Sequence, residues 1–172
     1  MKEYLETIAQ MMAVAARTAP KSAGQDFVKI EILTGQVLAN LSREMITYGA
    51  KTGKKNFDRD GNNIAKSDAL VLVGLKDSKT VGLNCGACGY PECAKLPAVK
   101  EGPEFKGPYC AYRLLDLGIA LGSAAKTAGI LNADSRIMYR VGVIARQMKL
   151  IDSDYVLGIP ISASGKSIYF DR

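Results

Sequence analysis

All four cysteines of this chain lie in one short, irregular stretch, from Asn84 to Tyr112. Three fall in the run Asn84-Cys85-Gly86-Ala87-Cys88-Gly89-Tyr90-Pro91-Glu92-Cys93 and the fourth in Pro108-Tyr109-Cys110, which gives the spacing C-x2-C-x4-C-x16-C. Prolines at positions 97, 103 and 108 prevent the stretch from forming one continuous helix. Four thiolates that reach one point make a soft, anionic, tetrahedral site, which suits an iron–sulfur cluster or zinc. We therefore expect the chain to fold around a metal-binding segment, residues 84–110.

Two details of the spacing favour an iron–sulfur cluster over zinc. Zinc sites usually pair two C-x2-C turns, or one such turn with two histidines, whereas this chain has a single such turn and no histidine. Three cysteines close together and a fourth from further along the chain are typical of [4Fe–4S] sites. The predicted ligands are Cys85, Cys88, Cys93 and Cys110, with zinc as the weaker alternative. A third interpretation is buried or disulfide-bonded cysteines, and disulfides require an oxidising compartment.

Small and aromatic neighbours of the cysteines fit the cluster interpretation. Gly86 and Gly89 remove side chains where the backbone must fold around an inorganic core, and they leave N–H groups free to point at sulfur. Together with Tyr90 they are expected to set the hydrogen bonds and the solvent access of the site.

The cysteine run resembles a known iron–sulfur module. Cys-Gly-Ala-Cys-Gly-Tyr-Pro-x-Cys, with a further cysteine after sixteen intervening residues, is similar to the module of electron-transfer and corrinoid proteins from anaerobes. In that module all four cysteines bind one [4Fe–4S] cluster. The whole chain, with its ending Gly158-Ile159-Pro160-Ile161-Ser162 and Gly165-Lys166 to Phe170-Asp171-Arg172, resembles the uncharacterised ferredoxin-domain proteins of bacteria and archaea. This resemblance implies an iron–sulfur protein and carries over no agreed activity.

Length and composition predict one domain, residues 1–172, with a single core. An apolar content of 48% and a charged content of 23% are typical of soluble globular proteins. The net charge of +6 is modest. The one dense basic run consists of Lys51, Lys54, Lys55 and Arg59, with Phe57 as its only aromatic neighbour. A nucleic-acid binder would show clustered cations with aromatics beside them, so we predict no nucleic-acid partner.

No stretch reaches the roughly 18 uninterrupted apolar residues of a membrane helix. Residues 114–131 come closest, and Asp116 and Lys126 interrupt them. At the N-terminus, Glu3 and Glu6 disrupt the basic start that a signal peptide needs. We therefore predict a cytoplasmic protein without a membrane partner.

Hydrophobic periodicity predicts helices over residues 2–17, 36–51, 111–130 and 134–148, and strands over residues 27–33, 69–75, 155–161 and 167–170. The strand at 69–75 is apolar throughout, which is typical of a central strand buried on both faces. The helix at 111–130 is apolar nearly all round and is expected to be central. The polar, turn-rich residues 52–67 are expected to form a solvent-exposed loop.

The N-terminal part of the chain carries a second resemblance. A helix, the loop Ala16-Arg17-Thr18-Ala19-Pro20-Lys21-Ser22-Ala23-Gly24 and a strand are similar to the opening of nitroreductase-like flavoproteins, in which such a loop lines the flavin. The glycine- and alanine-rich helix after Asp116-Leu117-Gly118 also resembles theirs. The resemblance implies an α+β fold with a mixed β-sheet flanked by helices, a cysteine-rich loop inserted in it, and a homodimer with FMN at its interface. It marks Arg17, Lys21, Ser22, Ala23 and Gly24 as a loop that binds a flavin or an anion.

The sequence departs from the flavoprotein pattern at two places. The N-terminal Arg-Ser-Arg motif that grips the FMN phosphate is missing, since residues 6–10 hold no cation, and Lys21 is inserted in the loop. We therefore expect weak or no FMN binding on a retained fold. An ordinary helix-to-strand loop is the alternative interpretation of residues 17–26, because short motifs often match by chance.

Three functions are open on these grounds. The leading hypothesis is electron transfer or another redox role through one [4Fe–4S] cluster, with a redox partner protein that the residues do not identify. The second is a flavin-dependent oxidoreductase coupled to the cluster. The third is a zinc-stapled, non-enzymatic interaction domain. No catalytic residue is assigned, and the lack of histidine removes the Ser–His and Cys–His pairs of hydrolases.

Overall fold

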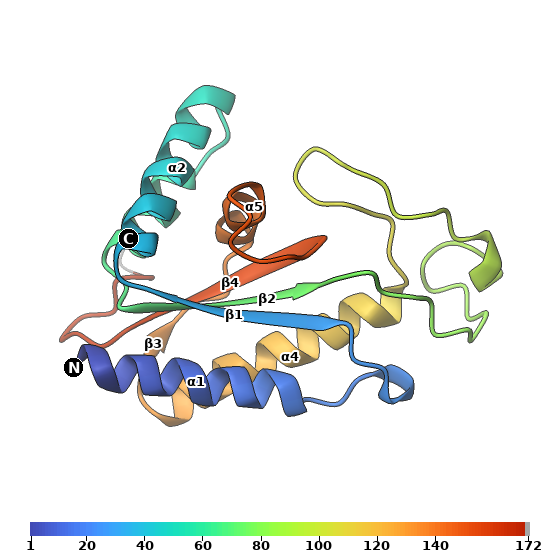
Figure 1. Ribbon diagram of the computed structural model, residues 1–172, viewed down its shortest axis with the longest axis horizontal. Coiled ribbons are helices and arrows are strands. Elements are labelled where there is room, and N and C mark those ends of the chain that lie inside the picture. The colour runs from blue at the N-terminus through green and yellow to red at the C-terminus, as the bar shows by residue number, and fades with distance from the viewer. Residues whose placement is uncertain (171–172) are drawn as a thin grey trace.

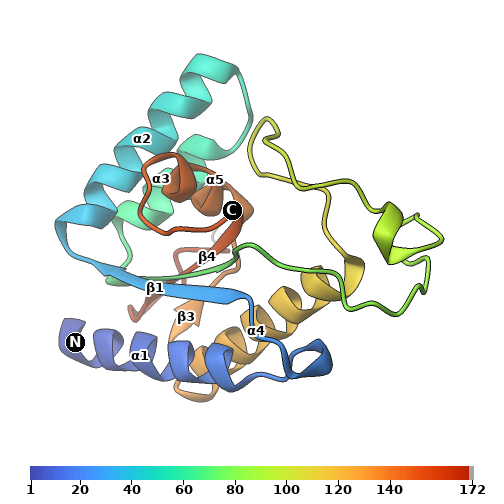
Figure 2. The ribbon, with the colours of Figure 1, turned by 45° about the vertical axis from the view of Figure 1, so that its right-hand side comes forward.

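The computed structural model describes residues 1–170, and its centre is a four-stranded sheet in the order β1-β2-β4-β3. The strands are β1 (Val28–Thr34), β2 (Ala69–Leu75), β3 (Asp134–Ser135) and β4 (Tyr155–Ser162). The helices are α1 (Lys2–Thr18), α2 (Gln36–Thr52), α3 (Phe57–Ala65), α4 (Ala111–Ile130) and α5 (Tyr139–Gln147). Figure 1 shows α1 and α4 on one face of the sheet and α2 and α5 on the other, and Figure 2 shows α3 beside α2.

Helices on both faces bury β2 completely. Every residue of β2 is buried, and its side chains alternate between two apolar cores. Val71 and Val73 pack toward α1 and α4, whereas Leu70 and Leu72 pack toward α2, α3 and α5. The alternation follows from the two-residue period of a strand. The predicted central strand is confirmed, and the sheet divides the expected single core into two.

The predicted α+β class and the flanking helices are confirmed, while the sheet differs from the expected mixed one in that every described pairing is antiparallel. Helices α2 and α3 bring the chain back to the point where β1 ends, so that Thr34 faces Ala69. Later, α4 runs back along the sheet and α5 returns, so that Tyr155 faces Leu75. A pair of helices between neighbouring strands gives antiparallel neighbours, whereas one crossover helix gives parallel ones.

Most predicted elements agree with the structure to within one residue at each end, namely the helices at 2–17, 36–51 and 111–130 and the strands at 27–33, 69–75 and 155–161. The predicted helix 134–148 begins only at Tyr139, because residues 134–135 pair with β4. The predicted strand 167–170 is wrong, since the structure shows no strand there. Instead Tyr169 is buried, and its hydroxyl shares a hydrogen bond of 2.9 Å with Ser67 Oγ.

The polar stretch 52–67 is not a solvent-exposed loop, because residues 57–65 form α3. Phe57 and Ile64 lie seven positions apart and are both buried in the core beside α2. Asp60 is buried as well, and ion pairs with Arg59 at 2.6 Å and Arg140 at 3.1 Å balance its charge. The helix therefore depends on tertiary partners that composition does not reveal.

Helix α4 is less central than predicted, because one of its faces lies open. Leu115 and Ile119 are 57% and 44% exposed. Gly118 and Gly122 lie on the same face, and nothing within 4 Å would meet a Cβ at either position. The opposite face, which includes Leu117, packs in the core with α1 and the sheet.

Candidate functional site

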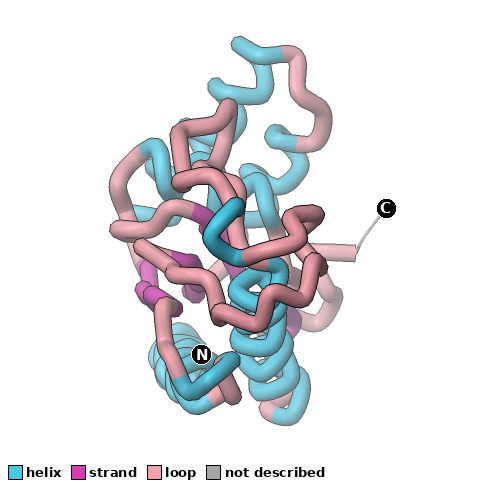
Figure 3. The backbone as a smooth tube through the Cα atoms, turned by 90° about the vertical axis from the view of Figure 1, so that its right-hand side faces the viewer, coloured by secondary structure: helices cyan, strands magenta, loops and turns pink. Residues whose placement is uncertain are grey.

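The cysteine-bearing segment projects from one end of the sheet. It leaves the end of β2 and returns to the start of α4, with only the short 3-10 turn Cys93–Lys95 as a helical element. In Figures 1 and 2 it stands apart from the helical layers, and Figure 3 views the molecule from this end. Cys85 is exposed, Cys88 and Cys93 are half-buried, and Cys110 is buried. The segment thus consists of an exposed turn with three thiols and a buried base with the fourth.

Left-handed backbone conformations shape the exposed turn, which we define as residues 84–96. Asn84, Gly86 and Gly89 have φ values of 48°, 71° and 87°. The two glycines adopt these values without a Cβ penalty, as expected for a backbone that folds tightly. The Asn84 side chain accepts the N–H of Cys93 at 2.8 Å, and the N–H of Asn84 points at Cys93 Sγ at 3.4 Å. This reciprocal pair closes the turn, and N–H···S contacts are of the kind that tune a thiolate ligand.

Cys110 occupies a different environment, at the N-cap of α4. Its carbonyl accepts the backbone N–H of Arg113 at 3.0 Å, and the helix continues for 20 residues. Only 7% of Cys110 is exposed. The positive end of the helix dipole favours negative charge at this position, which suits a thiolate ligand.

The four thiols fit a metal cluster by their chemistry, although the structure does not gather them at one point. All four are free. Within residues 1–170, no three His, Cys, Asp or Glu side chains form a group that could hold a metal ion. Hydrogen bonds and ion pairs of the exposed turn are internal to it in the described chain. A site with four thiolate ligands therefore requires the turn to close over Cys110.

Asp154, immediately before β4, holds both ends of the cysteine segment. Its Oδ2 accepts the N–H of Asp77 at 3.0 Å, where the chain leaves β2, and its Oδ1 lies 2.8 Å from Lys106 Nζ, where the chain returns. Burial alone would raise the pKa of Asp154, but the bonds from Lys106 and from the Asp77 N–H outweigh burial and lower it. The carboxylate is therefore ionised at neutral pH and fixes the base of the segment.

Contacts with the body of the protein also tie down the returning arm, residues 100–109. The ring centroid of Phe105 lies 4.4 Å from that of Tyr155. Arg146 of α5 lies 2.7 Å from Glu101 and donates to the carbonyl of Glu104 at 3.3 Å. The arm is thus anchored to β4 and α5, in contrast to the exposed turn.

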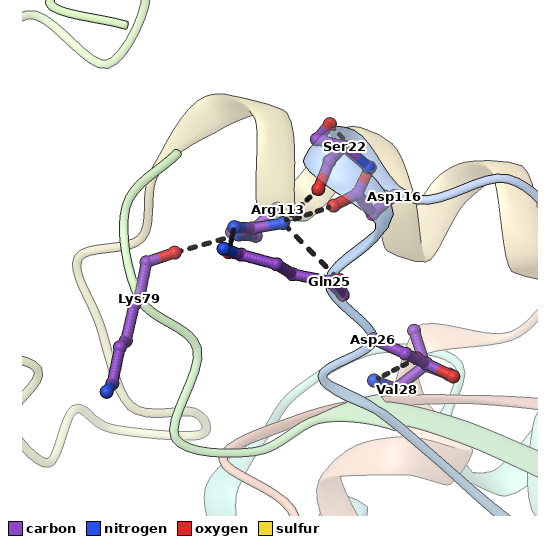
Figure 4. A network of polar contacts seen from close by, with 7 residues as sticks. All are labelled: Ser22, Gln25, Asp26, Val28, Lys79, Arg113 and Asp116. Carbon is purple, nitrogen blue, oxygen red and sulfur yellow. Dashed lines mark hydrogen bonds and ion pairs between the residues drawn. The ribbon is translucent and has the colours of Figure 1, made fainter. Parts of the chain in front are cut away.

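A buried arginine joins the cysteine segment to the N-terminal loop (Figure 4). Arg113, in the first turn of α4, is 0% exposed and donates to Lys79 O at 2.8 Å, to Ser22 O at 3.0 Å and to Gln25 Oε1 at 2.6 Å. It also forms an ion pair of 3.1 Å with Asp116, which accepts the N–H and the O–H of Ser22 at 2.8 and 2.7 Å. The sequence interpretation gave neither charged residue a role. The available signal is a pair of opposite charges three positions apart in a mainly apolar helix.

The loop predicted to bind a flavin or an anion has its cations engaged within the chain. Arg17 donates to Asp26 Oδ2 at 2.6 Å and to Val28 O at 2.8 Å. Lys21 Nζ donates to the carbonyls of Ala16 and Arg17, at 2.8 and 2.5 Å, at the end of α1. Burial lowers the pKa of Lys21, and the nearby Asp26 carboxylate offsets only part of this effect. Both cations are therefore committed to holding the loop.

The other three predicted loop residues form the 3-10 turn Ser22–Gly24. Ser22 is bonded to Asp116, whereas Ala23 and Gly24 are exposed and have φ values of 55° and 65°. The structure thus brings the five predicted residues together at the end of α1. Through Arg113 and Asp116 it connects them to the base of the cysteine segment.

Sequence comparison identifies the family of this chain. A protein of Archaeoglobus fulgidus, described as "Uncharacterized protein", is 46% identical over 171 residues, which cover 99% of this chain and 92% of that protein. The family profile described as "Uncharacterized protein containing a ferredoxin domain (DUF2148)" matches residues 106–172. The chain belongs to this ferredoxin-domain family. The region matched by the ferredoxin-domain profile includes Cys110, whereas Cys85, Cys88 and Cys93 precede it.

Structural comparison shows the nitroreductase fold. Nitroreductase CinD from Lactococcus lactis, in complex with chloramphenicol, aligns with a TM-score of 0.61 and 15% identity over 96% of this chain and 84% of its own. The FMN-dependent nitroreductase NfnB from Mycobacterium smegmatis, in complex with NADPH, aligns with a TM-score of 0.59 and 9% identity. The alignment covers 95% of this chain and 81% of that protein. A nitroreductase with bound FMN from Desulfitobacterium hafniense aligns with a TM-score of 0.57 and 12% identity. The alignment covers 93% of this chain and 78% of that protein.

The resemblance of the whole chain to the ferredoxin-domain family is confirmed, and so is the resemblance to the nitroreductase fold. The resemblance of the cysteine run to a [4Fe–4S] module stays a prediction. The description of the ferredoxin-domain family agrees with the predicted class of iron–sulfur redox protein. Among residues 1–170, no helix is long and apolar enough to cross a membrane.

Proposed function

We propose that this ferredoxin-domain protein is a cytoplasmic electron-transfer or redox protein that holds one [4Fe–4S] cluster on Cys85, Cys88, Cys93 and Cys110. The observation that carries the proposal is a set of four free thiols on one projecting segment, three in an exposed turn and one at the start of α4. The family description supports it. When bound, such a cluster supplies one-electron chemistry.

In this proposal the three thiols of the exposed turn draw together and the turn closes over Cys110. The bonds between Asn84 and Cys93 hold the two ends of the three-cysteine run together. Asp154 and Arg113 hold the base in place. Because only the turn has to become ordered, the loss of conformational entropy on assembling the four ligands is limited to a short stretch.

The position of the turn also suits contact with a redox partner protein. The turn lies at one end of the molecule, away from the helical layers (Figures 1 and 2). Leu83 and Val99, on either side of it, are 56% and 38% exposed. We propose that the electron donor or acceptor docks at this end, where exposed apolar residues flank the thiol-bearing turn in the chain.

Anaerobic purification, followed by iron, sulfide, zinc and flavin analysis of one sample, tests the proposal. We expect about four iron and four sulfide per chain, as one [4Fe–4S] cluster requires. Zinc without iron or sulfide would instead support the zinc-stapled interaction domain, because four thiolates also suit tetrahedral zinc. A folded protein that holds neither metal contradicts both proposals.

A second candidate function is a homodimeric, flavin-dependent oxidoreductase coupled to the cluster. The nitroreductase fold favours it, and so does the open face of α4, where Leu115 and Ile119 are exposed beside Gly118 and Gly122. Small residues on an exposed apolar face let a second helix approach closely. We propose that two copies of the chain meet on this face, with the loop at residues 17–25 near the boundary.

For this second candidate we expect weak or no FMN in the purified protein, and a dimer that persists without it. The reason is that Arg17 and Lys21 are bonded within the chain, so a phosphate would have to compete for them. FMN is titrated into the wild type and into a double variant, Arg17→Ala with Lys21→Ala, and light scattering measures the mass against 18.4 kDa per chain. The double variant should bind FMN more weakly still.

The control for this titration is a double variant of two exposed lysines outside the loop, Lys2→Ala with Lys51→Ala. Equal FMN binding by the loop variant and the wild type removes the loop from the site. Tight, stoichiometric FMN in the wild type would promote the oxidoreductase over the simple carrier. A mass of one chain contradicts the dimer.

A further inference from the structure

Arg113 is the one residue that touches both candidate sites in the network of Figure 4. Its Nε donates to the carbonyl of Lys79, five residues before the exposed turn begins. Its Nη1 and Nη2 donate to Ser22 and Gln25, in the loop that follows α1. Its own backbone N–H donates to the carbonyl of Cys110. The fully buried side chain therefore holds the chain before the exposed turn and the N-terminal loop in a single arrangement, and the backbone of the same residue bonds the last cysteine.

The chemistry of the guanidinium makes these contacts obligatory. It stays charged in proteins and presents its donors in a rigid, planar fork, so one displaced acceptor leaves a buried donor without a partner. The Phe27 ring lies 4.8 Å from the guanidinium carbon and closes one side of the network. Asp116 balances the charge and binds Ser22 through two bonds. The loop and the chain before the turn are thus held by the same pair of charges.

We infer that Arg113 is a positioning residue that couples ligation of the four thiols to the order of the loop at residues 21–26. The inference rests on the proposed function. Closing the exposed turn over Cys110 restrains the backbone before Asn84, which includes the carbonyl of Lys79. The restrained carbonyl fixes the guanidinium, and the guanidinium in turn fixes Ser22 and Gln25. By linkage the effect is reciprocal, so a ligand that orders the loop strengthens cluster retention by the same factor.

Hydrogen exchange measures this coupling directly. Protection of residues 21–26 is compared between the cluster-loaded protein and the protein after the cluster has been removed under anaerobic conditions. In the wild type, loading should raise protection of this loop on the order of tenfold, within the usual range of coupling between two sites. In Arg113→Lys, which keeps the charge and loses the fork, loading should leave the loop unchanged while iron and sulfide remain bound.

The matched control is Arg146→Lys. Arg146 also holds the cysteine segment, through Glu101 and Glu104, but bonds the returning arm rather than the N-terminal loop. This variant should keep the response of residues 21–26. If Arg113→Lys does not fold, Gln25→Ala is the alternative variant. Gln25 is exposed, and its side-chain oxygen accepts one bond from the Arg113 guanidinium, so its loss should weaken the rise in loop protection on loading.

The outcomes separate the two ideas. A protein that takes up neither iron nor sulfide overturns the proposed function, and this inference with it. A loaded wild type whose loop shows no change in protection overturns the inference alone. The inference alone is also overturned if Arg113→Lys keeps the full rise in loop protection on loading. The coupling would then not pass through the guanidinium, and Arg113 would have a merely structural role.

Discussion

Cys88→Ala is expected to abolish cluster binding and to lower the melting temperature of the anaerobically purified protein on the order of 10 °C. The reason is that metal–thiolate bonds supply folding free energy when the rest of a loop has few anchors. The exposed turn is such a loop, since the bonds that hold it are internal to residues 84–96. For a chain of this size each kcal/mol shifts the melting temperature by roughly 2–4 °C. Iron and sulfide analysis and thermal unfolding of the same preparation check both effects.

Two controls separate loss of a ligand from damage to the turn. Ala87→Ser changes an exposed neighbour in the same turn without removing a thiol, and it should keep both metal content and melting temperature. In protein from which the cluster has been removed, Cys88→Ala itself should shift the melting temperature by only about 1–2 °C, as for other surface substitutions. If the variant keeps full iron and sulfide and melts with the wild type, Cys88 is not a ligand.

The sequence predicted the elements whose hydrophobic period is strong and local. The strand at 69–75 is buried on both faces because helices cover both, and a continuous apolar run is the signal of that arrangement. Helix α3 was missed because its stability depends on Asp60 meeting Arg140, eighty residues away, and on Phe57 meeting α2. Local propensity contains no term for such partners.

The site shows the same division between local and distant information. Cysteine spacing alone marked the thiols, because ligand chemistry depends on residue type and on short separations. The loop cations were marked by type too, but the structure gives Arg17 a partner in Asp26 and Lys21 the carbonyls that end α1. Arg113 went unnoticed because its acceptors, including Lys79 and Ser22, come from other parts of the chain. Burial of a charge is a property of the fold, and one sequence gives only the pair Arg113 and Asp116 as a hint.

Helix α5 carries Arg146, which holds the returning arm of the cysteine segment, so the packing of α5 on β4 bears on the site. That packing leaves no room for a side chain at Gly142. A Cβ at this position would lie 1.8 Å from the carbonyl oxygen of Val156 and 2.4 Å from its carbon. The obstacle is backbone of a central strand, two residues after Asp154, so it cannot swing aside as a flexible side chain would.

Gly142→Ala is therefore expected to destabilise the protein strongly. Overpacking of a core typically costs about 1–3 kcal/mol, and a backbone obstacle places this case at or above the upper end. The melting temperature should fall on the order of 10 °C. Thermal unfolding measures the cost, and Gly129→Ala is the matched control, since it is also a helical glycine but nothing lies within 4 Å of its Cβ position. There alanine should stabilise the helix by up to about 1 kcal/mol. Equal melting temperatures for the two variants would show that α5 does not lie as close to β4 as the structure places it.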